Sequence, residues 1–216
     1  MRVDEKNSRE IATQIKDKKL VEERRSQIVD CAVKLFIKHG YHKTTTRMLA
    51  RETGLSIGSL YEYITTKDDV LYLVCMAIHN AVDSALHEAM ERSSLLGGRE
   101  SLKNIIREYF LVCNRMSDHV LLMYQVTHLL PVERQNIVLE SELGITALFI
   151  DSMQQLKKNG KLILDDDTIN LIGHNISVIG HTWAFRRWYF CRNFTIDQYI
   201  EKQTEFIMGF LPETIE

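Results

Sequence analysis

Residues 45–67 read TTRMLARETGLSIGSLYEYITTK, and this stretch decides the expected fold. Thr45 is a suitable N-cap, because its hydroxyl can accept a hydrogen bond from a backbone N–H that is unpaired at the start of a helix. Gly54 stands where a helix ends most easily, in a left-handed residue. The first half of the stretch therefore predicts a short helix over 46–53 that stops at a glycine turn.

The second half of the stretch predicts another short helix over 57–63, with Ser56 as its N-cap. Leu60 and Ile64 are four residues apart and share its inner face. The residues left on its outer face are Gly58, Ser59, Tyr61 and Glu62. Because a second helix with small residues near its N-terminus can enter the major groove of DNA, the stretch indicates a helix-turn-helix.

The segments on either side supply the support for these two helices. Before them, a helix is predicted over 21–39, because apolar positions recur there at helical spacing. These positions are Ile28, Ala32, Leu35, Phe36 and His39. After them, Thr66 is expected to cap a long helix over 67–93. Asp68 and Asp69 lie in its first turn, beside the positive end of the helix dipole.

The rest of the chain also has the pattern of helices, without the alternation of a strand. Further helices are predicted over 100–116, 119–130, 133–158, 168–192 and 195–211. Only two prolines and ten glycines occur in 216 residues, which suits long helices with short connections. The sequence thus predicts an all-α protein, and its hydrophobic fraction of 45% suffices for a real core.

Neither a membrane span nor a signal peptide is expected. No apolar run reaches about 18 residues, and the N-terminus MRVDEKNSRE lacks an apolar region. The four cysteines stand singly on predicted helices, and we interpret them as small core residues in a reducing, cytoplasmic compartment. They are Cys31, Cys75, Cys113 and Cys191.

The formal net charge of −2 conceals an asymmetry along the chain. Residues 1–67 hold 14 Lys or Arg and 9 Asp or Glu, whereas the remainder holds 13 and 20. A basic N-terminal part is expected if only that part meets phosphate, although charge also differs by chance between halves of many proteins. Residues 1–20 are highly charged without an apolar stripe, so a solvated tail, a basic arm and an extended first helix all stay open.

Five motifs between residues 24 and 73 together resemble the TetR family of bacterial transcription regulators. They are A-x-x-L-F, H-G-Y, T-T-x-R-x-L-A, G-L-S-I-G-S-L-Y-x-Y and K-D-D-V-L, in this order. Each motif is weak alone, but the order and spacing are specific. One departure is Ile64-Thr65, where the family more often has Phe followed by a polar residue. Ile64 can still pack inward.

The resemblance implies an all-helical, two-part regulator. After the charged extension over 1–20, it implies a helix-turn-helix domain over 21–66 and a helical domain over 67–216 that binds a small ligand and forms a two-fold dimer. The expected function is a repressor that a small hydrophobic effector releases from a palindromic operator in double-stranded DNA. An acyl-CoA or a fatty acid is the candidate effector, and no cofactor is implied.

The same resemblance assigns roles in DNA binding, residue by residue. Ile57 and Ser59 would approach base edges, Gly58 would let the backbone come close, and Arg47 would reach a phosphate or a flanking base. The remaining expected DNA contacts, mainly to phosphates, are Thr45, Thr46, Ser56, Tyr61, Tyr63 and Lys67. Helix capping is the alternative for the capping hydroxyls, and packing against the first helix is the alternative for Tyr61.

The segment GHTWAFRRWYF, residues 180–190, is the second unusual feature. It resembles the corresponding helix of a TetR subgroup that includes fatty-acyl-CoA-responsive repressors. Trp183 could contact an acyl chain and Arg187 a phosphate or carboxylate. The alternative is an interface helix with Arg stacked on Trp. Other candidate ligand contacts, for which core packing competes, are Phe110, Cys113, Tyr124 and His128.

The last two predicted helices carry wide apolar faces, which we interpret as the dimer interface, with packing inside one chain as the alternative. These faces comprise Ile172, Ile176, Ile179, Trp183, Tyr199, Phe206, Ile207 and Phe210. No metal site is expected, because His174 and His181 are seven residues apart without a carboxylate partner.

Two other function classes compete with the regulator. An enzyme would need a nucleophile elbow, a phosphate loop, a metal cluster or paired carboxylates, and none of these motifs occurs, so no catalytic residue is assigned. A helical adaptor that binds only protein leaves the small-residue second helix and the basic N-terminal part unexplained. The sequence therefore favours a DNA-binding regulator.

Overall fold

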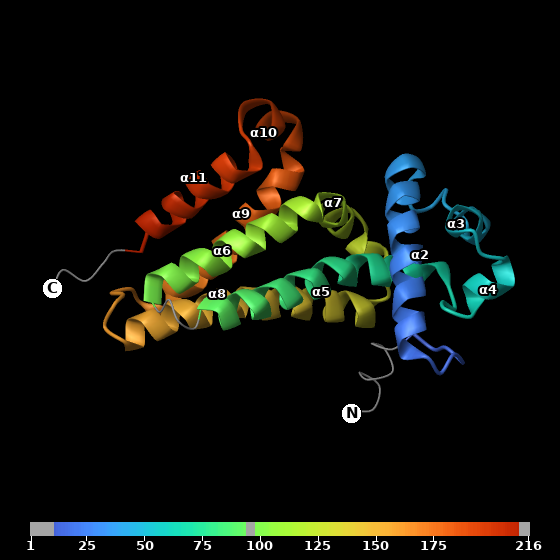
Figure 1. Ribbon diagram of the computed structural model, residues 1–216, viewed down its shortest axis with the longest axis horizontal. Coiled ribbons are helices and arrows are strands. Elements are labelled where there is room, and N and C mark those ends of the chain that lie inside the picture. Colours follow the sequence, from blue (N-terminus) through green and yellow to red (C-terminus); the bar gives the residue numbers. More distant parts are fainter. Residues whose placement is uncertain (1–10, 94–97, 212–216) are drawn as a thin grey trace. The chain divides into compact units, whose positions relative to one another are not determined.

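The computed structural model describes residues 11–93 and 98–211, and every regular element within them is a helix (Figure 1). In chain order the helices are α2 (Lys18–His39), α3 (Thr46–Thr53), α4 (Ile57–Tyr61), α5 (Lys67–Ser93), α6 (Gly98–Arg115), α7 (Ser117–Val126), the short 3₁₀ helix η1 (Thr127–Leu129), α8 (Val132–Lys158), α9 (Asp166–Phe185), α10 (Arg187–Asn193) and α11 (Ile196–Gly209). The predicted all-α fold is confirmed.

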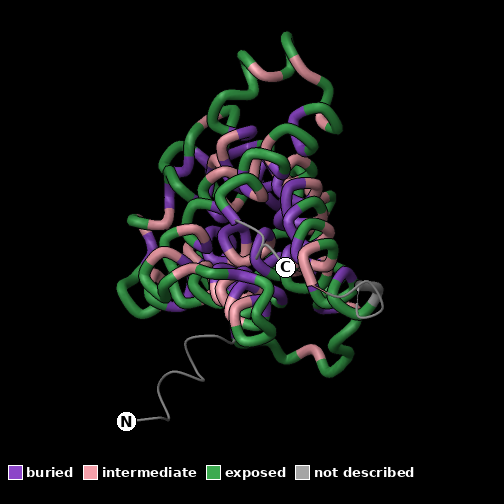
Figure 2. Tube along the Cα trace, turned by 90° about the vertical axis from the view of Figure 1, so that its left-hand side faces the viewer, coloured by how far each residue is buried: buried purple, intermediate pink, exposed green. Residues whose placement is uncertain are grey.

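The helices form two compact units. Unit 1 contains the described residues up to 77 together with 118–140, and unit 2 contains 78–117 together with those from 141 onward. Both α5 and α8 run through the two units. Buried residues follow the inner faces of the helices, and exposed residues follow their outer faces (Figure 2).

Unit 1 is built on α2, which packs against α3, and α3 packs against α4. The apolar stripe predicted for α2 is buried, apart from His39 at its end. Leu49 of α3 and Leu60 of α4 are each fully buried. Helix α2 starts three residues earlier than predicted, because Asp17 acts as its N-cap and accepts a hydrogen bond from the Leu20 N–H at 3.1 Å.

Unit 2 has α6 at its centre, packed against both α9 and α11. The ring of Tyr109 on α6 is buried edge-on against Phe149 of α8, with ring centroids 5.1 Å apart. It also lies directly on Gly180 of α9, where an added Cβ would stand 2.3 Å from a ring carbon. The glycine is therefore what allows α6 and α9 to approach so closely.

The single helix predicted over 168–192 is wrong, because the chain breaks at Arg186 into α9 and α10. Arg186 has φ −119° and ψ 24°, outside the helical region. In one straight helix, side chains seven residues apart are displaced by about 10 Å along the axis. The break instead stacks the Phe190 ring on Trp183, with centroids 5.9 Å apart and planes 6° apart. Aromatic packing thus outweighs helix continuity here.

Other helix boundaries lie close to those predicted. The helix predicted over 57–63 ends at Tyr61, because the N–H groups of Glu62 and Tyr63 turn back to the carbonyls of Ser59 and Leu60. The predicted break after α5 falls on residues 94–97, outside the described residues, and α6 begins at Gly98.

The apolar composition of α5 follows from its place in the core. The segment Lys67–Glu91 is long enough and, with a mean hydropathy of 1.3, apolar enough to cross a membrane, although it contains no unbroken apolar run of that length. Half of the most apolar stretch of this segment is buried inside the protein, so packing in the core explains its composition without a lipid environment.

The prediction of four core cysteines is half right: Cys75 and Cys113 are buried, but Cys31 is partly exposed and Cys191 is exposed.

Candidate functional site

A tight turn joins α3 to α4 as the sequence predicts. Gly54 adopts the left-handed conformation, with φ 71° and ψ 15°, and its N–H returns to the last turn of α3. The Thr45 hydroxyl accepts from the Met48 N–H at 3.2 Å, and the Ser56 hydroxyl accepts from the Ser59 N–H at 3.0 Å. Side chains therefore define both helix starts, and the angle between the helices is set locally.

The outer face of α4 is open to solvent. Ile57 is 42% exposed and Tyr61 is 48% exposed. A Cβ added at Gly58 would meet only the Ser56 hydroxyl, at 3.8 Å. The Tyr61 hydroxyl lies 3.4 Å from that of Thr46, so the ring leans toward α3. Nothing in the described residues covers this face, which leaves it accessible to a large partner.

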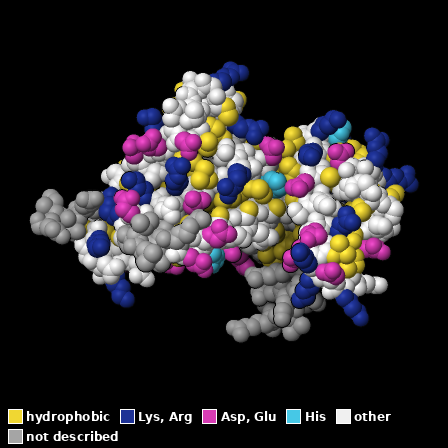
Figure 3. All heavy atoms as spheres, viewed as in Figure 1, with side chains coloured by type: hydrophobic (Ala, Val, Ile, Leu, Met, Phe, Trp, Pro, Cys, Tyr) yellow, Lys and Arg dark blue, Asp and Glu magenta, His cyan; other side chains and the backbone are white. Residues whose placement is uncertain are grey.

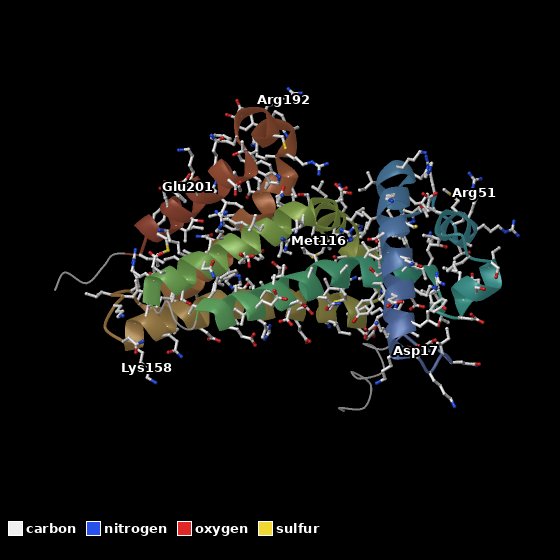
Figure 4. All side chains as sticks on the ribbon, in the orientation of Figure 1. Asp17, Arg51, Met116, Lys158, Arg192 and Glu201 are labelled. Carbon is white, nitrogen blue, oxygen red and sulfur yellow. The ribbon has the colours of Figure 1, made fainter. Side chains whose placement is uncertain are left out.

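Exposed basic side chains lie on α3, the helix that packs against α4. Arg47 and Arg51, four residues apart on α3, are both exposed, and Figure 4 shows Arg51 directed away from α2. Figure 3 shows further Lys and Arg side chains over α2 and α3. Arg51 is a phosphate-binding candidate that the sequence interpretation missed, although its spacing from Arg47 already placed both on one face.

Lys67 has a structural role that the sequence did not predict. Its ammonium donates to the carbonyl oxygens of Tyr41 and Thr44, each at 3.1 Å, and lies 4.1 Å from the Tyr41 ring centroid. The Tyr41 hydroxyl hydrogen-bonds to Asp68, and burial together with this contact raises the pKa of Tyr41 well above its ordinary value. Lys67 thus fixes the loop between α2 and α3, and its third N–H remains for a phosphate.

A largely buried ion pair between Asp69 and Arg134 was not predicted from the sequence. The Asp69 carboxylate accepts from the N–H groups of Thr65 and Thr66, each at 2.7 Å, and from the Arg134 guanidinium at 2.6 Å. Both charged side chains are largely buried, and Arg134 also lies over the Tyr72 ring, 4.9 Å from its centroid. The first turn of α8 therefore holds the segment that leaves the helix-turn-helix.

The described part of the N-terminal extension is ordered against the same domain. Ile11 is buried, and its carbonyl accepts from Arg25, which also donates to the Tyr63 carbonyl. The Thr13 hydroxyl donates to the Glu62 carbonyl at 2.7 Å. Residues 11–17 therefore pack beside the end of α4, whereas residues 1–10 lie outside the described residues.

Most of the predicted DNA contacts are exposed or partly exposed. Thr45, Arg47, Ser56, Ile57, Gly58 and Tyr61 are exposed, and Thr46, Ser59 and Lys67 are partly exposed. Tyr63 differs, because it is 6% exposed and belongs to the core of unit 1. Its burial argues against a phosphate contact, so we leave Tyr63 out of the proposed interface.

The local geometry agrees with comparisons to known proteins. Residues 28–72 match the family described as bacterial regulatory proteins, tetR family. The chain is 28% identical over 200 residues to the HTH-type transcriptional regulator HbdR of Aromatoleum sp. (strain CIB), covering 93% of this chain and 86% of HbdR. Residues 28–72 therefore form a DNA-binding domain of the tetR family, and the chain is similar along most of its length to a transcriptional regulator.

Solved TetR-family structures share the fold over most of the chain. A regulator from Rhodococcus RHA1 has a TM-score of 0.75 and 18% identity, covering 89% of this chain and 98% of that one. AibR, solved with isovaleryl coenzyme A and operator DNA, has a TM-score of 0.67 and 17% identity, covering 87% and 97%. These relatives are transcriptional regulators and not enzymes, which supports DNA-binding regulation by this chain.

The predicted ligand contacts are divided between the two units. Phe110, Cys113 and Trp183 are buried in unit 2, and Arg187 is exposed there on α10. Tyr124 and His128 belong to unit 1 and are both exposed. Phe110, Cys113 and Trp183 thus share the buried interior of unit 2, on α6 and α9.

A buried polar network lies beside those three residues in unit 2. The Tyr109 hydroxyl donates to the Ser177 carbonyl at 3.0 Å and lies 3.0 Å from His181 Nε2. Burial raises the pKa of Tyr109 and lowers that of His181, so both stay neutral near pH 7. His79 Nε2 lies 3.1 Å from the Glu142 carboxylate.

The network provides hydrogen-bonding groups inside an otherwise apolar unit. The Thr146 and Ser177 hydroxyls are 2.8 Å apart, and among the described residues His79 Nδ1 and Trp183 Nε1 are buried without a partner. Unpaired buried groups are costly and often mark a binding site. The sequence signal for this network was the set of polar residues at core positions of apolar helices, which the predictions did not weigh.

Large apolar side chains on α9 and α11 remain exposed. Of the predicted interface residues, Ile176, Trp183, Tyr199 and Ile207 are instead buried within the chain. Phe206 and Phe210 are each 57% exposed, and on α9 the exposed residues are Leu171, at 62%, and Val178, at 53%. The apolar face predicted from sequence therefore exists with partly different members.

Proposed function

We propose that this protein is a homodimeric, cytoplasmic TetR-family repressor that binds a pseudo-palindromic operator and leaves it when a small hydrophobic effector binds. The observation that carries the DNA-binding part is the solvent-open face of α4, together with the exposed Arg47 and Arg51 on the adjoining helix α3. Neither an enzyme nor a protein-only adaptor accounts for this face.

In the proposed complex, α4 enters the major groove. Ile57 offers only apolar contact, for example to a thymine methyl, and Ser59 offers one hydroxyl, so few base-specific hydrogen bonds are available. Thr45, Ser56, Tyr61 and Lys67 would hold phosphates, and Arg47, Arg51 and Thr46 would extend the contact on α3. Phosphate contacts and half-site spacing would therefore carry much of the selectivity.

A dimer is proposed because one such helix makes too few contacts for tight binding. The exposed apolar residues Leu171, Val178, Phe206 and Phe210 are the proposed interface. In the proposed division, residues 21–66 bind DNA, and residues 67–216 bind the effector and form the dimer. Residues 11–17 pack against the DNA-binding part.

The effector is proposed to bind in unit 2, near Phe110, Cys113 and Trp183. These buried residues adjoin the polar network, which suits a ligand with an apolar body and a hydrogen-bonding end. An acyl-CoA or a fatty acid is the proposed class, supported by the isovaleryl coenzyme A bound to AibR and by the aromatic-arginine segment 180–190. Arg187 remains a candidate for the phosphate or carboxylate.

Selection from random duplex DNA tests the DNA-binding proposal. We expect an enriched sequence with two inverted half-sites about 10 base pairs, or a multiple of that, apart. Purified protein that enriches no sequence above background would refute the proposal that the chain is a DNA-binding regulator.

Native mass spectrometry of the same preparation tests the effector. It should reveal a bound acyl-CoA or fatty acid, and adding that compound should weaken the gel shift with the operator. A saturating acyl ligand that leaves the shift unchanged would refute the effector class.

The dimer is tested by placing charge on its proposed apolar face. Phe206→Glu/Phe210→Glu should convert the dimer to a monomer in sedimentation and weaken operator binding at least about 100-fold, since each lost aromatic contact costs about 2 kcal/mol. The matched control Glu201→Gln changes an exposed side chain elsewhere on α11 and should remain dimeric. A double variant that stays dimeric would contradict this interface.

A further inference from the structure

The carbonyl end of α4 is held by side chains from other parts of unit 1. Helix α4 spans only five residues, Ile57–Tyr61, and a helix this short is not stable by itself. Its last turn contains no basic side chain. The two carbonyls that follow the helix, those of Glu62 and Tyr63, each accept a hydrogen bond from a side chain outside α3 and α4. The shape of α4 therefore depends on residues that lie earlier in the chain.

Thr13 and Arg25 are these two donors. The Thr13 hydroxyl donates to the Glu62 carbonyl at 2.7 Å, and Arg25 Nε donates to the Tyr63 carbonyl at 3.0 Å. The end of a helix carries partial negative charge on its unpaired carbonyls, so a guanidinium is a suitable partner there. Arg25 belongs to α2, whereas Thr13 precedes that helix. The end of α4 is thus capped jointly by α2 and by the segment before it.

The segment before α2, residues 11–17, is itself anchored beside Arg25, and we call it the N-terminal segment. Arg25 Nη2 donates to the Ile11 carbonyl at 2.8 Å, and the Ile11 side chain is only 6% exposed. The Thr13 hydroxyl accepts from the Ile15 N–H at 3.2 Å, which fixes the local turn. Figure 1 shows this segment as the blue coil that leads into α2. One guanidinium therefore ties the N-terminal segment to the end of α4.

The composition of the N-terminal segment argues against a direct contact with phosphate. Its sequence, IATQIKD, contains one basic residue, Lys16, and one acidic residue, Asp17, so its formal charge is zero. A segment that bound the DNA backbone would need a surplus of basic side chains. We therefore expect the segment to act on DNA binding through the helix that it holds.

We propose that the N-terminal segment and Arg25 position α4 for operator recognition. They hold the carbonyl end of the helix in the free protein, so the helix is already ordered when it meets the major groove. A preformed helix does not subtract the free energy of its ordering from the free energy of binding. Thr13 and Arg25 are thus positioning residues that act through α4. This inference rests on the proposed function, in which α4 is the recognition helix.

Thr13→Val and Arg25→Met test this role by fluorescence anisotropy with the selected operator and with a random duplex. Operator affinity should fall about fivefold for Thr13→Val and about 100-fold for Arg25→Met, because a neutral or a charge-assisted hydrogen bond is lost at each of two half-sites. Affinity for the random duplex should stay within about twofold, because nonspecific binding depends on phosphate contacts. A role limited to folding would instead lower both affinities by the same factor.

Two further variants and a second measurement support the assignment. Arg25→Lys keeps the cation but reaches only one of the two carbonyls, so part of the affinity should return. The matched control Gln14→Ala changes an exposed side chain of the same segment and should bind the operator normally. In hydrogen exchange of the free Thr13→Val protein, the N–H groups of Glu62 and Tyr63 should exchange faster, whereas those of α9 should not change.

Thr13→Val carries the test even if Arg25→Met does not fold, since the threonine is exposed. The proposal is overturned if Thr13→Val binds the operator at wild-type affinity, or if it weakens operator and random duplex equally. Gly58→Glu, on the outer face of α4, separates this failure from that of the proposed function. If only Gly58→Glu weakens binding, α4 recognises DNA without help from the N-terminal segment. If neither variant weakens binding, α4 is not the recognition helix and both proposals fail.

Discussion

Gly58→Glu should abolish specific operator binding while leaving the fold unchanged. A side chain at this position meets only the Ser56 hydroxyl, at 3.8 Å, so the free protein accommodates it. Against DNA, the new carboxylate would face phosphates and base acceptors and keep α4 out of the groove. With about 1–3 kcal/mol lost at each of two half-sites, the affinity should fall by about 30-fold to 20,000-fold.

The measurement is a fluorescence anisotropy titration of the selected operator, with circular dichroism melting as the control for folding. Gly58→Ala is the matched variant, because it adds only the Cβ and no charge. We expect it to weaken binding by a smaller factor, in proportion to how closely the α4 backbone approaches the bases. If Gly58→Glu melts normally and still binds the operator at wild-type affinity, α4 is not the recognition helix.

The sequence predicted the helix-turn-helix well because its signals are local. Thr45, Gly54 and Ser56 each act within three or four residues, through a hydroxyl that caps a helix or a glycine that permits positive φ. Such signals do not depend on the rest of the fold. The second helix nevertheless ends two residues early, because the burial of Tyr63 and Ile64 in unit 1 draws the chain inward.

Features that depend on distant residues could not be predicted in the same way. The break at Arg186 follows from Phe190 stacking on Trp183, and both rings also pack on Tyr199 of the next helix. The stripe of α9 and α11 looked uniformly apolar in sequence, and only tertiary packing separates buried Ile207 from exposed Phe206. Helical periodicity identifies an apolar face but not which neighbour covers each part of it.

The ion pair between Asp69 and Arg134 shows the same limit, since 65 positions separate its members. Asp69 was expected only to complement the helix dipole of α5. In the structure it collects two backbone N–H groups and the guanidinium of Arg134, which stands in the first turn of α8. Nothing local in the sequence distinguishes this arginine from an exposed one.

Arg134→Met should therefore be the most destabilising exchange of a charged side chain in unit 1. The methionine fills a similar volume but leaves the buried Asp69 carboxylate without its cation, and such a loss costs about 3–5 kcal/mol. Because two backbone N–H groups still bind Asp69, we expect the lower end, about 3 kcal/mol. The melting temperature should fall by about 6–12 °C, measured by scanning calorimetry.

Two further variants separate the charge from the packing. Arg134→Lys keeps a cation but loses the planar group that lies over Tyr72, so an intermediate loss is expected. In Arg134→Met/Asp69→Asn both charges are gone, and the double variant should be more stable than the sum of the single losses by about 1–3 kcal/mol. Strictly additive losses would mean that the two side chains do not interact, and that the segment after α4 is held by the backbone hydrogen bonds of Asp69 alone.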